Sequence, residues 1–568
     1  MANTIISPKI LSPVMLWENF DAAQPLKESV IGEEVYDDIV YRETYFSGRE
    51  TNDGRVRIFG VYAKSKSTGK KSNKGAILIL PDFSDTVNYE VINLYVKQGY
   101  AVLMVDYRGK FGETENYTKY PESVSYANYE NCKDAIDEVT DSAWETCWYE
   151  WAAVAKYAVS FLKSLPEIER VGVLGIKNGG NIGWILCGTD ARVDCFVPLF
   201  GAGWRGYRGV FKNGSEEMRA DDSHLRFLAG IDAHAYAQYV KCPVFYMGAS
   251  NSPDFDFDRT VDTMMRISDG VIRYTNYAPY YRDVLNKNCK RNVDLFFAKY
   301  LLDFKLLFPE EPVLSCMVDE NVLSCDVELD FSDLKKPKTV TVYVAEGGVN
   351  PANRDWQPAV MLKGLREDKK SFIYKISGNC EFVTLYAVVE YRSGVTVSSN
   401  SVCKKVSLNS PFPQKLLYSA KDKYPSFSTY DLASKSVGGL FFENDDGIMV
   451  VPGANGIFGI SSPYGSIVSY KMNNQNVAIN SNSIVLADVY AEDYTSLKVT
   501  LMVEASPLET VDYSCVLDLK GGNIWQNVSI KAVDFKNAMR LSVKDFSKVV
   551  AIRFETENKC VYNNVLII

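Results

Sequence analysis

The sequence has 568 residues, of which 46% are hydrophobic. This length exceeds what one hydrophobic core supports, so we expect about three domains. The net charge of -9 and the isoelectric point near 5.2 argue against nucleic acid as a partner, because no concentrated basic patch offsets the repulsion. No apolar run approaches the roughly 18 residues of a membrane span, and the first residues lack a secretory pattern. We therefore expect a cytoplasmic protein with no membrane partner.

Residues 1–310 carry the pattern of an α/β domain with an N-terminal arm. From about Tyr41 to Lys64, two β-rich stretches flank a turn signal at residues 51–54 and predict a hairpin. Strands and helices then alternate. The predicted strands are Gly75 to Leu80, Ala101 to Asp106, Val171 to Ile176, Asp194 to Phe200, Pro243 to Gly248 and Gly270 to Tyr274, and the predicted helices are Glu90 to Gly99 and Trp148 to Ser164. This alternation predicts a parallel sheet covered by helices on both faces.

The pattern changes after the proline-containing segment 308–312. Residues 311–409 contain short alternating segments such as TVTVYVAEG and FVTLYAVVEYRSG, which predict an immunoglobulin-like β-sandwich. A second proline-containing break follows at residues 409–413. Beyond it, segments such as SIVLADVYAED and VVAIRFETE predict that residues 410–568 form another all-β domain, with a jelly-roll-like sandwich.

The segment VGVLGIKNGG, residues 171–180, has the layout of a nucleophile elbow with a lysine at the nucleophile position. An elbow of the form G-x-S-x-G places a serine on a sharp turn between a strand and a helix. Gly175 and Gly179 supply the small residues of that turn, and Lys177 stands where the serine would be. An ammonium group is a poor acyl acceptor at neutral pH unless desolvation lowers its pKa. We therefore predict that the nucleophile is missing.

Several ordered pieces resemble the α/β-hydrolase superfamily, in its acetyl-xylan-esterase and dienelactone-hydrolase-like branch. The pieces are ILILPDFSD, YAVLMVDYRGKFGE, YPESVSYANYE and the segment that ends in VGVLGIKNGG, and they cover residues 40 to 300. The resemblance implies an oxyanion hole formed by a backbone N–H of the loop 82–86, with Phe83 and Ser84 as candidates, and by the N–H of Asn178. Asp82 and Asp85 in that loop would oppose catalysis if they pointed inward.

The resemblance also implies a triad acid and a histidine, in that order along the chain. The acid position falls after the strand Pro243 to Gly248, where Asp254 is the candidate, with Asp256 and Asp258 behind it. Only two histidines occur, His224 and His234, and both precede Asp254.

The histidine position therefore falls on the segment YTNYAPYYRDV, where Tyr281 stands near it. Tyrosine and arginine titrate too high to act as a general base without large perturbation. Both histidines lie instead in a segment, 201–240, that would form a cap, where lone histidines are more often on the surface.

Three interpretations of Lys177 stay open at this point. It could form a Schiff base, it could act as the base for Ser84, or it could fill the former pocket and pair with Asp254 or Asp283. The first two require a neutral amine held by desolvation, and the nearby acids favour the charged form instead. We therefore favour the third.

The last domain resembles the jelly-roll carbohydrate-binding modules, on the segments SYKMNNQNVAINSNSIVLADVYAED and GGNIWQNVSIKAVDF. If it binds sugar, Trp525 and Tyr464 are the candidate platforms, because aromatic rings stack on sugar rings. In the cap segment, Trp204 is the candidate for an exposed aromatic side chain.

These patterns favour a catalytically inactive α/β-hydrolase-like protein, a pseudoenzyme with a binding, scaffolding or assembly role. The alternatives are an active carboxylesterase or deacetylase on an acylated carbohydrate, with a displaced nucleophile, and a structural subunit of a homo-oligomer. The possible partners are an acylated sugar or glycan, a second copy of the chain, or another protein. We expect no cofactor and no metal, because the twelve cysteines show no zinc-ligand spacing.

Overall fold

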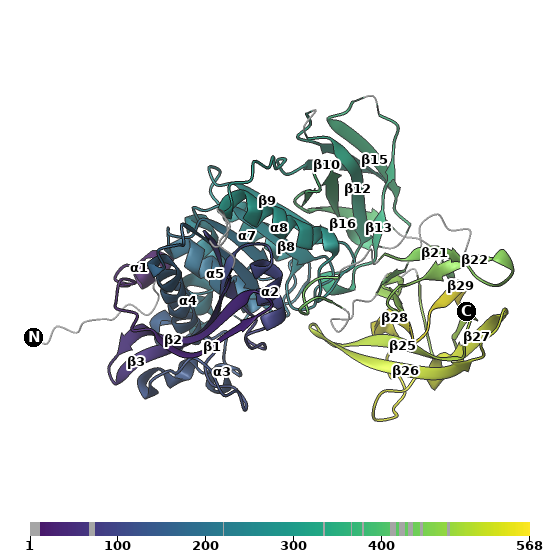
Figure 1. Ribbon diagram of the computed structural model, residues 1–568. Helices are drawn as coiled ribbons and strands as arrows, with labels where there is room; N and C mark the ends of the chain where they lie inside the picture. The colour runs from purple at the N-terminus through teal and green to yellow at the C-terminus, as the bar shows by residue number, and fades with distance from the viewer. Residues whose placement is uncertain are drawn as a thin grey trace, which may run out of the picture.

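A computed structural model describes the chain except for residues 1–11, 67–73, 220, 333–334, 365, 378–379, 409–415, 420–426, 430–435, 443–446 and 474–476. Figure 1 shows an α/β region, purple to teal, followed by a green β region and a yellow-green β region. The predicted break at residues 409–413 lies outside the described residues. In the described part of the chain, no helix combines the length and the apolar character needed to cross a bilayer.

A nine-stranded sheet forms the centre of the α/β region, in the order β1-β2-β3-β5-β4-β6-β7-β8-β9. Pairing is antiparallel from β1 to β5 and parallel from β5 to β9. The strands are β1 (Ser29–Tyr36), β2 (Ile39–Thr51), β3 (Gly54–Ser65), β4 (Gly75–Leu80), β5 (Ala101–Asp106), β6 (Arg170–Ile176), β7 (Cys195–Leu199), β8 (Val244–Ala249) and β9 (Arg273–Ala278). The strand order reverses beside β4, so that the loops after β4 and β6 meet at the carboxyl edge of the sheet.

Helices cover both faces of this sheet. On one face lie α4 (Cys147–Ser164) and α5 (Asn178–Thr189), whose buried residues share a core with Leu78 and Leu103. On the other face lie α2 (Tyr89–Val96) and α8 (Lys287–Leu301), which pack on Ile77 and Ile79. Alternate residues of the same strands thus serve opposite faces, as the period of a strand requires. The predicted fold class, a doubly covered α/β-hydrolase-like sheet followed by all-β sandwiches, is confirmed.

The sequence pattern predicted most of these elements within a few residues but missed strand β1 and helix α8. Strand β4 has the bounds predicted for it, whereas β9 begins three residues after the start we predicted, Gly270. Strand β1 was not predicted. It lies at the edge of the sheet and is exposed along nearly its whole length, so it carries no hydrophobic alternation by which the sequence would reveal it.

The middle β region contains two sheets, in the orders β10-β11-β15-β14 and β13-β12-β16-β17, with β18 paired to β16. Its strands are β10 (Val313–Asp319), β11 (Val322–Glu328), β12 (Pro337–Glu346), β13 (Trp356–Pro358), β14 (Val360–Met361), β15 (Lys369–Lys375), β16 (Cys380–Tyr391), β17 (Thr396–Ser398) and β18 (Val402–Leu408). Buried residues of these strands belong to the same core as α2 and α8. The middle sandwich is therefore packed directly on the α/β region.

The last β region also contains two sheets, in the orders β21-β22-β29-β24-β27, with β19 paired to β29, and β20-β23-β28-β25-β26. Its strands are β19 (Leu416–Tyr418), β20 (Ser428–Thr429), β21 (Met449–Pro452), β22 (Phe458–Ser461), β23 (Ser466–Ser469), β24 (Ile484–Ala491), β25 (Thr495–Ser506), β26 (Glu509–Leu519), β27 (Trp525–Lys531), β28 (Val549–Thr556) and β29 (Cys560–Ile567). Its own core lies between the two sheets. Four buried residues of this region, Leu440, Phe441, Phe442 and Tyr464, belong instead to the core that contains α2 and α8.

Short helices surround the carboxyl edge of the large sheet. The segment 201–240 contains η3 (Arg205–Tyr207), α6 (Asp222–Gly230) and η4 (Ala233–Tyr239), and α7 (Phe257–Arg266) follows β8. Elsewhere in the described α/β region, the short helices are α1 (Pro13–Trp17), η1 (Glu122–Ala127), α3 (Tyr129–Cys132) and η2 (Ala143–Glu145). The candidate functional site lies where η3 and the loops after β4, β6, β8 and β9 come together.

Candidate functional site

The turn between β6 and α5 has the backbone of a nucleophile elbow. Lys177 has φ 51° and ψ -114° and stands immediately before the helix, a conformation that L-residues rarely adopt. A Cβ atom at Gly179 would lie 2.0 Å from the backbone oxygen of Leu80, and one at Gly175 would lie 2.6 Å from Gly180 Cα. The glycine spacing predicted a strained turn, and the structure has one. Lys177 stands at the apex of this turn, where the G-x-S-x-G pattern has a serine.

The N–H that would form half of an oxyanion hole is occupied by a carboxylate. The backbone N–H of Asn178 donates to Asp82 Oδ1 at 3.1 Å, and the Asn178 side-chain amide donates to the same oxygen at 2.8 Å. The second oxygen, Asp82 Oδ2, accepts from the Ser84 hydroxyl at 2.7 Å. Asp82 is 7% exposed, so its carboxyl group is buried against the turn.

A buried arginine holds the other side of Asn178. Arg205 donates from Nη1 to Asn178 Oδ1 at 2.7 Å and forms a two-pronged ion pair with Asp137, at 2.7 and 3.0 Å. Its guanidinium also lies over the rings of Phe83 and Trp148, at 5.7 and 5.4 Å. Asn178 is thus fixed between Asp82 and Arg205.

Sequence reasoning did not single out Arg205 or Asp137. Arg205 follows the candidate Trp204 directly in the segment GAGWRGYRG, but nothing in its spacing indicates a role. The two partners lie 68 positions apart, and only the packing of η3 against the preceding loops brings them together.

Two acids, Asp85 and Asp283, experience the charge of Lys177. Burial raises the pKa of Asp85 and of Asp283, and the Lys177 charge opposes that shift in both. Of the two expected partners, Asp283 therefore experiences the Lys177 charge. Asp254 instead forms an ion pair with Arg208 at 3.2 Å, and both side chains of this pair are about half exposed. The predicted pairing of Lys177 with Asp254 is wrong, because Asp254 points out toward the cap segment.

The other acids after β8 serve structural purposes. Asp256 caps helix α7 by accepting from the N–H groups of Asp258 and Arg259. Asp258 forms two hydrogen bonds with the guanidinium of Arg354, at 2.7 and 2.6 Å. The Arg354 side chain is 0% exposed and that of Asp258 5%. The loop where a triad acid would lie thus anchors the middle sandwich.

The segment after β9, where a histidine would lie, also forms contacts between regions. Tyr281 is 7% exposed, and its ring packs on Phe442 of the last region. Arg282 donates to the backbone oxygen of Ala352 at 3.0 Å and to the Tyr470 hydroxyl at 2.9 Å. This segment therefore contacts both β regions and presents a phenol where a base would be needed.

Further backbone contacts continue the same interface. The N–H of Leu285 donates to Leu440 O at 2.8 Å, and Leu285 O accepts from the N–H of Phe442 at 2.9 Å. On the loop after β8, the Asn251 amide donates to Ala352 O and Arg354 O, at 3.2 and 2.9 Å.

The two histidines do not supply a base to the elbow. His234 is 6% exposed, lies 3.2 Å from Asp232 and stacks on Trp204 with ring centroids 4.0 Å apart. The expectation that it lies on the surface is wrong, because η4 turns it beneath the Trp204 ring. His224 is half-buried, and its Nε2 contacts the backbone oxygen of Gly206.

The three aromatic candidates for ligand binding differ in how far they are buried, and each contacts other residues of the protein. Tyr464 is 8% exposed and stacks on Phe442 at 4.4 Å, so the prediction of an open sugar platform there is wrong. Trp204 is half-buried and donates its indole N–H to Thr263 at 2.8 Å. Trp525 is half-buried and donates to Ala454 O at 3.0 Å.

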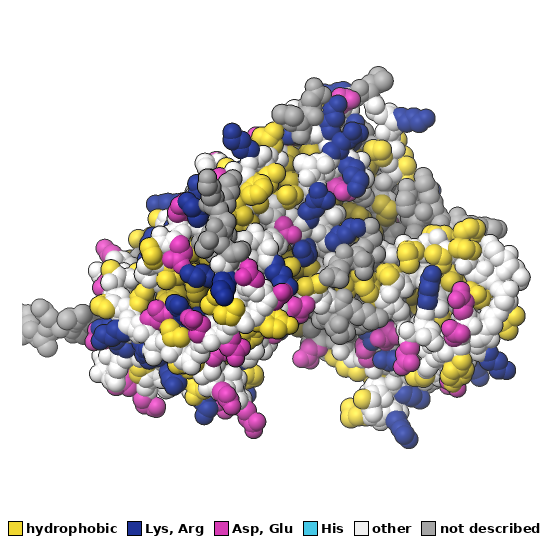
Figure 2. All heavy atoms as spheres, viewed as in Figure 1, with side chains coloured by type: hydrophobic (Ala, Val, Ile, Leu, Met, Phe, Trp, Pro, Cys, Tyr) yellow, Lys and Arg dark blue, Asp and Glu magenta, His cyan; other side chains and the backbone are white. Residues whose placement is uncertain are grey.

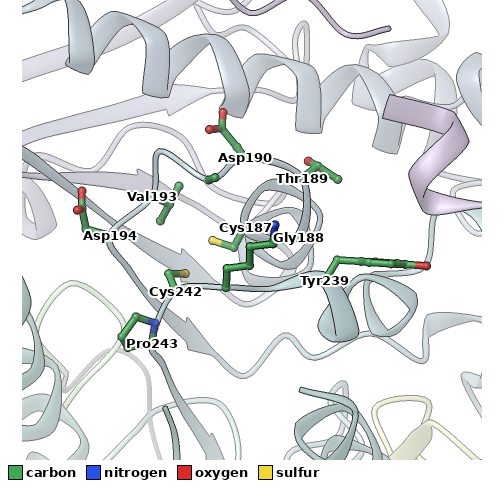
Figure 3. A pocket seen from close by; sticks show the side chains of 11 residues that line it. Cys187, Gly188, Thr189, Asp190, Val193, Asp194, Tyr239, Cys242 and Pro243 are labelled. Carbon is green, nitrogen blue, oxygen red and sulfur yellow. The ribbon is translucent and has the colours of Figure 1, made fainter. Parts of the chain in front are cut away.

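A cavity of about 390 Å³ lies away from the elbow, at the amino ends of β7 and β8 (Figure 3). Its lining includes Cys187, Asp190, Tyr239 and Cys242. Burial raises the pKa of Cys187 well above its ordinary value, and the Cys242 thiol beside it adds to that rise. The Cys187 thiol is thus protonated at neutral pH, and none of the residues of the elbow lines this cavity.

Comparison with known proteins gives only distant structural likenesses. No family model matches the sequence, and no curated protein matches it. Among solved structures, the chain is similar to an acetyl xylan esterase from Paenibacillus sp. R4, with 16% identity over 52% of this chain and 97% of that one and a TM-score of 0.40.

Two further structures lie in the same range. The chain is similar to acetyl xylan esterase 1 from Thermoanaerobacterium sp. JW/SL YS485, with 17% identity over 51% of this chain and 92% of that one and a TM-score of 0.36. It is also similar to an esterase from Pyrococcus furiosus, with 16% identity over 46% of this chain and 93% of that one and a TM-score of 0.31. The architecture assigned to the α/β region rests on its own strand order and elbow.

Proposed function

We propose that this protein is a catalytically inactive α/β-hydrolase-like scaffold, in which the carboxyl edge of the sheet joins three regions instead of hydrolysing an ester. The observation that carries the proposal is the Asp82 carboxylate, which accepts the backbone N–H of Asn178. In ester hydrolysis that N–H must stabilise an oxyanion. A fixed buried carboxylate at the same place repels the oxyanion and uses up the donor.

The missing groups support the same conclusion independently. Acyl transfer requires an activated nucleophile with a base in hydrogen-bond reach. The elbow offers Lys177 in place of a serine, and Tyr281 stands near the position of the base in chain order. Since Asp258 and Arg282 are committed to contacts with Arg354 and Ala352, the acid and histidine loops serve as a structural joint.

The alternative is an esterase with a displaced nucleophile, and Ser84 is its best candidate. The Ser84 hydroxyl donates to Asp82, which would have to act as its base. The Asp82 carboxylate would then need to accept the proton of the Ser84 hydroxyl while it still accepts the hydrogen bond from the Asn178 N–H. We therefore favour the inactive scaffold.

Hydrolysis of an aryl acetate by the full chain tests the proposal. We expect turnover by the wild type to equal that of the Lys177→Ala and Ser84→Ala variants, at the level of a non-catalytic protein surface. The exposed Lys110→Ala variant is the matched control for loss of a lysine. Turnover well above that level, abolished in Lys177→Ala or Ser84→Ala and retained in Lys110→Ala, would refute the proposal and establish the esterase.

A further inference from the structure

A second cavity, of about 300 Å³, lies between strands β1 and β2 and the helix α2. We call it the tyrosine pocket. Its walls include the rings of Tyr36, Tyr41 and Tyr89, and its floor includes Gly32. None of the residues of the elbow or of the joint belongs to it, so its role is independent of the function proposed above. Its volume is in the range of small-molecule sites.

The strand register explains why this side of the sheet edge is hollow. Gly32 pairs with Glu43, Glu34 with Tyr41, and Tyr36 with Ile39. Because side chains alternate along a strand, the even-numbered residues of β1 and the odd-numbered residues of β2 share one side. Because Gly32 has no side chain, the Glu43 side chain lies against its backbone, and Tyr89 of α2 lines the same cavity.

Hydrogen bonds hold two of the rings in place before any ligand arrives. The Tyr89 hydroxyl donates to Glu43 Oε1 at 2.7 Å, and the Tyr41 hydroxyl donates to Asn93 Oδ1. The two ring centroids are 5.7 Å apart, with the planes inclined at 59°. Tyr36 is 73% exposed and is free to complete a third wall. Tethered rings lose little conformational entropy on binding, which favours affinity.

The charges in the tyrosine pocket all have one sign. Glu34 and Glu43 belong to its lining, and none of the seven described residues that line it is basic. Two basic side chains nearby pair with acids outside the lining: Lys97, whose charge also acts on Tyr41, pairs with Asp37 at 3.2 Å, and Arg42 pairs with Glu33 at 3.2 Å. In Figure 2, acidic and basic side chains are both visible over the part of the front face where Figure 1 draws β1 and β2, so the single sign of charge is confined to the lining of the pocket.

We propose that the tyrosine pocket binds a small quaternary ammonium compound. The faces of aromatic rings attract a cation that has lost part of its water, and quaternary ammonium groups are recognised by cages of such rings. Glu34 and Glu43 add a Coulombic attraction that an uncharged ligand does not experience. The same two carboxylates repel anionic ligands. A neutral sugar would use the rings but not the charge.

Calorimetric titration of the full chain with choline chloride tests this assignment, with 3,3-dimethyl-1-butanol as a neutral ligand of the same shape. We expect choline to bind at least about 10-fold more tightly than the neutral alcohol, because only choline has the charge. Xylose serves as the sugar. If xylose binds and choline does not, if choline and the alcohol bind equally, or if choline shows no binding at millimolar concentration, the assignment is overturned.

Variants locate the binding. Gly32→Leu should abolish choline binding by filling the pocket, and it should fold, since a Cβ at Gly32 comes no closer than 3.5 Å to any atom. Glu43→Gln and Tyr36→Ala should each weaken binding by roughly 5-fold. The controls are Glu33→Gln, on the opposite side of β1, and Tyr494→Ala, which removes an exposed tyrosine of the last region. Choline binding that survives in Gly32→Leu would exclude the pocket as its site.

Discussion

The elbow and the joint lie at the same edge of the same sheet, yet they differ in what defines them. Backbone geometry defines the elbow, and side-chain contacts define the joint. At the elbow the backbone is strained at Lys177 and packed around glycines that no larger residue can replace. At the joint, the loops after β8 and β9 keep their place in the chain order, and their side chains bind the β regions. Backbone geometry at a packed turn is hard to change without unfolding the domain, whereas exposed loop side chains can acquire new partners.

Breaking the joint should have the largest effect on stability. Arg354→Met leaves the Asp258 carboxylate buried without its partner, which costs about 3 to 5 kcal/mol. Urea unfolding of the full chain, followed by tryptophan fluorescence, measures this loss. The control is Arg208→Met, which removes the half-exposed pair with Asp254 and should cost less than about 1 kcal/mol. Equal losses in the two variants would show that the joint is not a structural element.

The elbow backbone should be nearly as sensitive. Gly179→Ala forces a methyl group to within 2.0 Å of the Leu80 oxygen, and such overpacking costs about 3 kcal/mol. The same unfolding experiment applies. Gly270→Ala is the control, because its methyl group meets no atom within 4 Å and should change stability by about 0.5 kcal/mol or less. An unchanged free energy of unfolding in Gly179→Ala would mean that packing does not enforce the elbow geometry.

The pH dependence of stability tests a third buried group at the carboxyl edge of the sheet, Asp106 at the end of β5. Burial raises the pKa of Asp106 to about 6, despite hydrogen bonds from the N–H groups of Thr118 and Gly109 and the charge of Arg108. The folded pKa thus exceeds the unfolded value, so the stability that this group contributes is full below about pH 4 and is lost as the pH rises through about 6.

Asp106→Asn removes this dependence. Relative to the wild type, the variant should therefore gain about 2 to 3 kcal/mol between pH 4 and pH 7, measured by urea unfolding at each pH. Asp53→Asn is the control: hydrogen bonds from Ser123 lower the pKa of Asp53 to about 2, so its contribution is constant over the upper part of this range. A flat difference between Asp106→Asn and the wild type would mean that Asp106 is ionised throughout.

The smallest effect is expected at the apex of the elbow. Lys177→Gly should stabilise the protein by about 1 kcal/mol, because glycine adopts the conformation at φ 51° without strain. Lys177→Ala keeps a Cβ and should give no such gain. Thermal unfolding compares the two. A loss of stability in Lys177→Gly would show that the ammonium, through its charge on Asp85 and Asp283, outweighs the strain of the turn.

The sequence predicted the parts of the site that depend on backbone geometry and chain order. The spacing of Gly175 and Gly179 around Lys177 predicts a strained turn because only small residues fit such a turn. The absence of a histidine after Asp254 also follows from the sequence, since the order of the triad residues along this fold is constant. The strand and helix pattern of the α/β region follows from local periodicity in the same way.

The sequence did not predict contacts between distant side chains, and these decide what the site can do. Whether Asp82 faces the Asn178 N–H, 96 positions away, depends on how two loops pack. The burial of His234, the pairing of Asp258 with Arg354 and the exposed strand β1 with its tyrosine pocket likewise leave no local signature. The sequence by itself determined the strained turn and the missing base, because both follow from local backbone needs and chain order. Only the tertiary structure decided that Asp82 accepts the backbone N–H of Asn178 and that the loops after β8 and β9 bind the β regions, because those contacts depend on packing between residues far apart in the chain.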